Sequence, residues 1–198
     1  MTPDRLRAAL RGVPWLDAAL RRVATEPTAI GRFFAAAARR CGRLPVPDPP
    51  GWTADEAARA LLLTALPHGH AAAAETLYRQ GDAAEKRGVL RALPLLPIGA
   101  ECVPLLHDAI RTNDTRLVAA ALGPYARHLE QATWRQAVLK CVFTGVPLAV
   151  VDGLPERADG ELARMLAAFA AERHAAGRDM PADATDVLRR LTIPTTEA

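Results

Sequence analysis

Charged side chains that could bind or protonate a small molecule gather in one stretch of the chain, from residue 134 to residue 178. In no other part of the sequence do apolar residues at helical spacing and charged residues at particular positions occur so close together. Basic side chains beside carboxylates could hold an anionic substrate and exchange a proton with it. Structural ion pairs between helices use the same residue types. We therefore treat five residues as candidate ligand-binding residues without assigning a catalytic role: Lys140, Asp152, Arg157, Glu172 and Arg173.

Arg173 is the most informative candidate because of its place on a predicted helix. The segment 161–174 carries an apolar stripe at helical spacing, formed by Leu162, Met165, Leu166 and Phe169. Arg173 follows Phe169 by four residues, so it continues the stripe and its stem points inward. A guanidinium keeps its proton, so on a core face it pairs with a carboxylate or binds an anion. The alternative is an arginine at a helix end whose head group reaches water.

The elements that position these residues are all predicted to be helices. Residues 134–143 form one helix with Trp134 on its apolar face, and Gly145 and Pro147 end it. We expect Trp134 and Phe169 to be core residues. Capping boxes at Thr53–Glu56 and Asp82–Glu85 mark two helix starts, and no segment shows the alternation of a strand. The sequence therefore predicts an all-α fold, either an irregular, HEAT-like α-solenoid of antiparallel helix pairs or a globular helical bundle.

A proline-rich segment divides the chain near residue 50. Four prolines fall between positions 45 and 50, a density that neither helix nor sheet accommodates. We expect residues 1–50 to form an N-terminal helical segment with this connector, and residues 51–198 to form the main helical domain. A rigid loop lying over the core is favoured over a free linker.

Composition excludes several classes of protein. Half of the 198 residues are hydrophobic, aromatic residues make up only 5%, and the net charge is +3, so a sizeable core and only a weak nucleic-acid footprint are expected. No signal peptide and no membrane span is recognisable, which favours a soluble, cytoplasmic protein.

We expect no metal and no cofactor. His68 and His70 lie two residues apart but lack further ligands, and three scattered cysteines read as buried thiols: Cys41, Cys102 and Cys141.

Several short motifs resemble the EboA family. They are LPLLP at 93–97, PY at 124–125, WRQAVLKCVF at 134–143, PL at 147–148, GLPER at 153–157 and ELARML at 161–166. ER at 172–173, AAGR at 175–178, GWT at 51–53 and GD at 81–82 with Glu85 extend the likeness, which covers about residues 50–180. The chain departs from the family pattern at four positions, where the family favours asparagine three times and then tryptophan: Gly123, Arg135, Asp159 and His174.

The resemblance implies a bacterial protein encoded in an ebo-type gene cluster. EboA-like proteins are encoded beside proteins like a UbiA prenyltransferase, a TatD metal hydrolase, a dehydroquinate synthase and a sugar isomerase. The cluster is linked to trafficking or biosynthesis of secondary-metabolite precursors, and EboA itself has no established reaction. The expected function is therefore a helical adaptor or ligand-binding protein whose partners are other cluster-encoded proteins or a metabolite. The alternatives are an enzyme of unknown class acting on an anionic or prenylated small molecule, and a HEAT-like nucleic-acid-binding protein.

Overall fold

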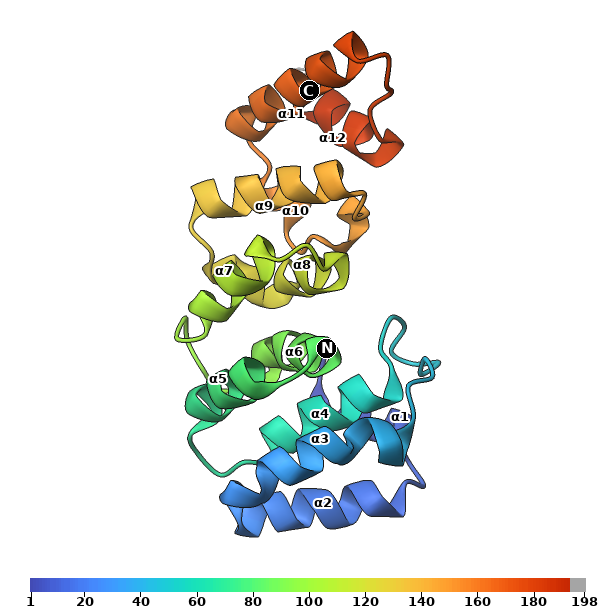
Figure 1. The fold of residues 1–198 in the computed structure, drawn as a ribbon, viewed down its shortest axis with the longest axis vertical. Helices are drawn as coiled ribbons and strands as arrows, with labels where there is room; N and C mark the ends of the chain where they lie inside the picture. Colours follow the sequence, from blue (N-terminus) through green and yellow to red (C-terminus); the bar gives the residue numbers. More distant parts are fainter. Residues whose placement is uncertain (193–198) are drawn as a thin grey trace, which may run out of the picture. The chain divides into compact units, whose positions relative to one another are not determined.

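Residues 1–192 are described by a computed structural model, and their regular structure is helical (Figure 1). Twelve α-helices and four short 3-10 helices account for it, so the predicted all-α class is confirmed. The described chain forms two compact units, residues 1–109 (unit 1) and residues 110–192 (unit 2). The boundary expected near residue 50 falls inside unit 1, and the predicted division into domains stays a prediction.

Unit 1 holds the first six α-helices, most of the seventh and two short 3-10 helices. They are α1 (Pro3–Ala9), α2 (Pro14–Thr25), η1 (Pro27–Ala29), α3 (Ile30–Cys41), α4 (Ala54–Thr64), α5 (His70–Gln80), α6 (Ala83–Ala92), η2 (Leu93–Leu95) and α7 (Val103–Arg111). The last of these begins at Val103, one residue before Pro104, because proline lacks an N–H and is tolerated only in the first turn of a helix.

Unit 2 contains the remaining helices. They are α8 (Thr115–Ala121), η3 (Pro124–His128), α9 (Gln131–Thr144), η4 (Leu148–Val150), α10 (Leu154–Arg157), α11 (Gly160–Ala175) and α12 (Ala182–Thr192). Gly145 ends α9 in the left-handed conformation (φ 75°), as the sequence predicted. Within residues 1–192, no helix is both long and apolar enough to cross a membrane.

Hydrogen bonds from capping side chains fix two of the helix starts in unit 1. Glu56 Oε2 accepts from the Thr53 N–H at 3.1 Å at the start of α4. At the start of α6, Asp82 and Glu85 exchange bonds of 2.8 and 3.0 Å with each other's backbone N–H. These bonds satisfy N–H groups that have no partner within the helix. Both capping boxes were predicted from the sequence and are confirmed.

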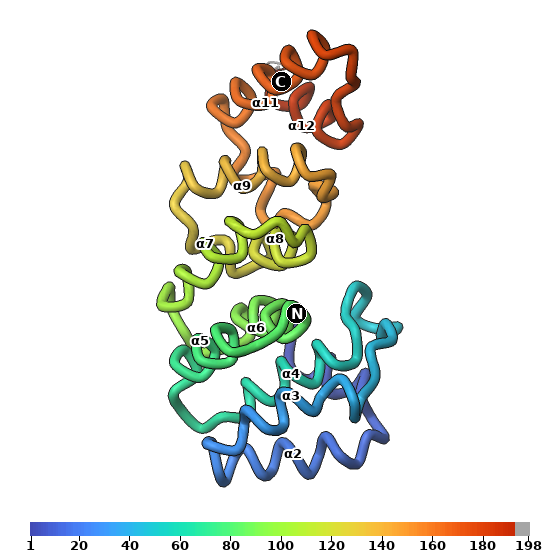
Figure 2. The backbone as a smooth tube through the Cα atoms, viewed as in Figure 1, coloured from blue at the N-terminus to red at the C-terminus, as the bar shows by residue number. Residues whose placement is uncertain are grey.

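Helix α4 lies at the centre of unit 1, where it packs against α1, α3 and α6 (Figure 2). All ten residues from 54 to 63 are buried. Because no side of this helix faces water, its three charged residues enter the core, and each is at most 2% exposed: Asp55, Glu56 and Arg59.

The proline-rich connector folds back onto unit 1. Backbone bonds of 2.9 Å from Val46 N–H to Trp52 O and of 3.0 Å from Ala54 N–H to Leu44 O close the segment into a loop. Val46 and Trp52 are buried, so the loop covers part of the core. The rigid-loop alternative is therefore confirmed over the free linker.

Gly88, on α6, lies so close to the side chain of Arg59 that position 88 has room for a hydrogen atom but not for a Cβ. A Cβ at position 88 would stand 2.8 Å from Cδ of Arg59, whose guanidinium is held by Asp55 at 2.6 Å. In an exposed helix interior, Gly→Ala stabilises by about 1 kcal/mol. Here we expect Gly88→Ala to lower the free energy of unfolding by about 1–3 kcal/mol, because the added methyl group overpacks the core. Chemical denaturation measures this change.

The matched control is Gly31→Ala, on α3. A Cβ at Gly31 meets no atom within 4 Å, so this variant should be as stable as the parent or more so. A Gly88→Ala protein that is more stable than the parent would contradict the packing argument.

Candidate functional site

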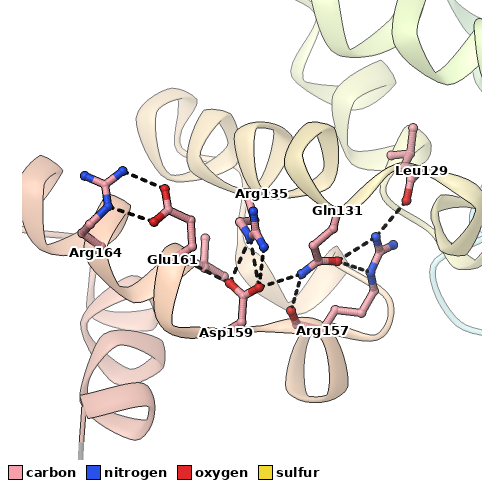
Figure 3. Close-up of polar contacts among 8 residues, drawn as sticks. Leu129, Gln131, Arg135, Arg157, Asp159, Glu161 and Arg164 are labelled. Carbon is pink, nitrogen blue, oxygen red and sulfur yellow. Dashed lines mark hydrogen bonds and ion pairs between the residues drawn. The ribbon is translucent and has the colours of Figure 1, made fainter.

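Arg157 belongs to a polar network in unit 2 (Figure 3). Its Nη1 donates to the Ala126 carbonyl at 2.8 Å, and its Nη2 donates to the Leu129 carbonyl at 2.9 Å. Nε and Nη2 also donate to Gln131 Oε1 at 3.2 and 3.1 Å, and the guanidinium lies 4.7 Å from the ring centroid of Trp134. Every one of these acceptors is neutral, and burial lowers the pKa of Arg157. Arg157 thus ties α10 to η3 and to the first turn of α9.

Asp159 extends this network to α11. It caps that helix by accepting from the Leu162 N–H at 3.0 Å, and it pairs with Arg135, whose Nη2 lies 2.6 Å from Oδ2. Gln131 Nε2 donates to the same oxygen at 3.2 Å. The guanidinium of Arg135, followed by the Leu162 N–H, holds the pKa of Asp159 far below its usual range. Asp159 is therefore an ionised hydrogen-bond acceptor at neutral pH and cannot serve there as a proton donor.

Arg135 and Asp159 were not among the sequence candidates. Both stand at positions where the chain departs from the EboA pattern, and the two departures carry opposite charges. The structure shows that they contact each other, so an ion pair occupies both positions. The opposite signs of the two changes were the signal that could have revealed the pair.

Lys140 caps the end of another helix. Its Nζ donates to the backbone carbonyls of Ile110 and Thr112 at 2.6 and 2.8 Å. The last carbonyls of a helix lack partners within it, and a lysine ammonium satisfies them. Lys140 therefore connects α9 to the end of α7.

The other three candidates lie nearer the surface. Asp152 and Glu172 are exposed, whereas Arg173 is half-buried and its Nε donates to the Asp179 carbonyl at 2.6 Å. In residues 1–192, no hydrogen bond or ion pair joins any two of the five candidates Lys140, Asp152, Arg157, Glu172 and Arg173. Their role as ligand-binding residues stays a prediction.

An exposed aromatic ring on α9 contacts a half-buried aromatic ring on α11. The Phe143 side chain is 72% exposed, and its ring centroid lies 6.2 Å from that of Phe169 in an edge-on arrangement. The guanidinium of Arg173 lies 5.8 Å from the Phe169 centroid on the same helix. We refer to Phe143, Phe169 and Arg173 as the aromatic ledge.

Trp134 is fully buried, as predicted. Phe169 is only half-buried, so the prediction that it is a core residue was wrong.

Unit 1 contains a second concentration of charge, on α4. Arg59 Nη1 bonds Asp55 Oδ2 at 2.6 Å, and both side chains are at least 97% buried. Glu56 forms ion pairs with Arg87 and Arg91 of α6. The capping box in the sequence predicts only a capping role for Glu56. No sequence pattern signals this burial, because Asp55, Glu56 and Arg59 lie on one side of the helix, as charges that face water do.

A family model described as metabolite traffic protein EboA matches residues 13–188. The chain belongs to the EboA family. The match begins just before α2 and ends within α12, so the family similarity extends well before residue 50. No curated protein and no solved structure matches the chain.

The cysteine thiols of this EboA-family protein are poor nucleophiles. Burial raises the pKa of Cys41 and of Cys102 to about 11 and that of Cys141 to about 12. Thiolates are the reactive form, so these groups are nearly all protonated at neutral pH. Cys102 and Cys141 are buried as predicted, whereas Cys41 is half-buried. Among the described residues, no group of three or more His, Cys, Asp or Glu side chains could hold a metal ion.

Proposed function

We propose that this metabolite-traffic protein of the EboA family acts as a non-catalytic helical adaptor, and that it binds a protein encoded in the same gene cluster. The aromatic ledge is the observation that carries the proposal. Single exposed apolar residues are common on protein surfaces, but the ledge joins a largely exposed phenylalanine, a second aromatic ring and a guanidinium. Aromatic residues and arginine are enriched in the central contacts of protein interfaces.

The charge of the ledge indicates the chemistry of its partner. Within the described residues, Arg173 donates a hydrogen bond only through Nε. Both of its Nη groups are therefore available to an acceptor on a partner protein. A carboxylate matches a guanidinium fork, and an apolar side chain beside it would cover Phe143. The partner we propose therefore presents an amphipathic helix with an acidic residue next to its apolar face.

The alternative functions draw less support from the geometry. Lys140 and Arg157 donate to backbone carbonyls of unit 2, which is a structural use of both charges. Asp159, which shares Gln131 as a hydrogen-bond partner with Arg157, is already paired with Arg135. A ligand-binding, enzymatic or nucleic-acid-binding role remains a prediction from the sequence.

Replacing the most exposed ring tests the adaptor proposal. We expect Phe143→Ser to leave the melting temperature unchanged, because the side chain is 72% exposed, and to reduce recovery of the partner at least about tenfold. The measurement is affinity purification of the tagged protein from its native cell after chemical cross-linking, with quantitative mass spectrometry of the cluster-encoded proteins.

Leu44→Ser is the matched control, because Leu44 is 78% exposed and belongs to unit 1. This variant should recover the partner as well as the parent does. Equal recovery with Phe143→Ser would show that the ledge is not the contact surface. If the parent protein recovers no cluster-encoded protein, the adaptor proposal itself fails.

A further inference from the structure

Two guanidinium groups converge on one buried carboxylate in unit 1. Glu56 lies at the start of α4 with its side chain 1% exposed, and it pairs with Arg87 through Oε1 and with Arg91 through Oε2 at 3.5 Å. Arg87 and Arg91 are four residues apart on α6, so they share one side of that helix. Their side chains are 27% and 26% exposed, so both are half-buried and within reach of solvent.

The charges at this point do not balance. The neighbouring Asp55–Arg59 pair is neutral by itself, with N···O at 2.6 Å. Glu56 supplies one negative charge against the two positive charges of Arg87 and Arg91, which leaves one positive charge in excess. The pKa of Arg91 lies below its usual value. Burial is the main cause and repulsion from Arg87 adds to it, while the attraction of Glu56 acts in the opposite direction. An uncompensated positive charge that is partly removed from water favours the binding of an anion beside it.

Hydrogen-bond donors remain available beside this excess charge. Arg91 Nη1 donates to the Gly51 carbonyl at 2.6 Å, and its guanidinium lies 4.1 Å from the ring centroid of Trp52. Arg87 meets Glu56 through Nε. Among residues 1–192, both Nη groups of Arg87 and the Nη2 group of Arg91 therefore have no partner. A guanidinium carries five N–H donors, so several donors face the same side of α6.

One arginine would suffice to neutralise Glu56, which also accepts from the Thr53 N–H at 3.1 Å. The charge of the second arginine is therefore not needed to neutralise Glu56. We propose that Arg87 and Arg91 form a binding site for a small anion that presents carboxylate or phosphate oxygens, with Trp52 and the Gly51 turn beside it. Arginine forks suit both kinds of oxyanion. The site lies in unit 1 and is independent of the aromatic ledge, so it holds or fails separately from the adaptor function.

Inorganic phosphate and succinate are the probes that test this site in the purified protein. At constant ionic strength against sodium chloride, we expect one or both to raise the melting temperature and to change the fluorescence of Trp52 with a saturable dose response. A response to phosphate alone identifies a phosphate ligand, and a response to succinate alone identifies a carboxylate ligand. Phosphate also stabilises proteins non-specifically, so saturation and the variants decide the outcome.

Arg87→Gln should weaken the saturable binding at least about tenfold, because it removes the excess charge while Arg91 continues to pair with Glu56. Arg79→Gln is the matched control, since Arg79 forms an exposed pair with Glu75 on α5 and should leave binding unchanged. If Arg87→Gln does not fold, Arg87→Lys replaces it: lysine keeps a charge beside Glu56 but loses the fork that binds an oxyanion, so its binding should also be weaker than that of the parent. No saturable effect of either probe on the parent, or equal binding by the folded Arg87 variant, overturns the proposal.

Discussion

Arg59→Met will lower the free energy of unfolding by about 3–5 kcal/mol, because it leaves the carboxylate of Asp55 buried without its countercharge. The Asp55 side chain is 3% exposed, and Arg59 lies 2.6 Å from it. Methionine occupies a similar volume, so the loss reports mainly the uncompensated charge. Arg59 Nε also donates to the Phe34 carbonyl at 3.3 Å, and this bond is lost as well. Equilibrium denaturation in urea, followed by circular dichroism, measures the change.

A double variant separates the charge effect from packing. Asp55→Ala combined with Arg59→Met removes both charges, so it should recover most of the stability lost in the single variant. Arg79→Met removes an exposed guanidinium that stands 3.5 Å from Glu75, and we expect it to have little effect. A double variant as unstable as Arg59→Met would show that packing, and not the buried pair, accounts for the loss.

Trp134→Ala will also cost about 3–5 kcal/mol, because it removes a fully buried ring from the core of unit 2. Trp134 lies on the apolar face of α9, and the guanidinium of Arg157 lies 4.7 Å from its ring centroid. The substitution therefore leaves a cavity and also removes the aromatic face from a half-buried cation. Thermal unfolding monitored by circular dichroism gives the loss as a lower melting temperature.

Trp134→Phe is the matched control for this position. The indole Nε1 of Trp134 donates no hydrogen bond within the described residues, so phenylalanine keeps an aromatic face for Arg157 and loses no polar contact. This variant should lose less than half as much stability as Trp134→Ala. An unchanged melting temperature in Trp134→Ala would contradict the assignment of Trp134 to the core.

The sequence by itself determined where several helices begin and end. The capping boxes at Thr53–Glu56 and Asp82–Glu85 were readable because each bond joins residues three positions apart. Gly145 ended α9 for an equally local reason, the ease with which glycine adopts a positive φ. The burial of Trp134 also followed from helical periodicity, since its stripe had to pack against something. The all-α class follows from such local signals.

Only the tertiary structure decided which partners the charged residues have. Lys140 meets the Ile110 carbonyl across 30 positions of the chain, and Arg135 meets Asp159 across 24. Periodicity shows which side of a helix is apolar, but it does not show which helix covers that side or how completely. Phe169 is half-buried for this reason, although its stripe predicted a core position. Arg59 enters the core for the converse reason, because α4 is covered on every side by helices that its own sequence does not specify.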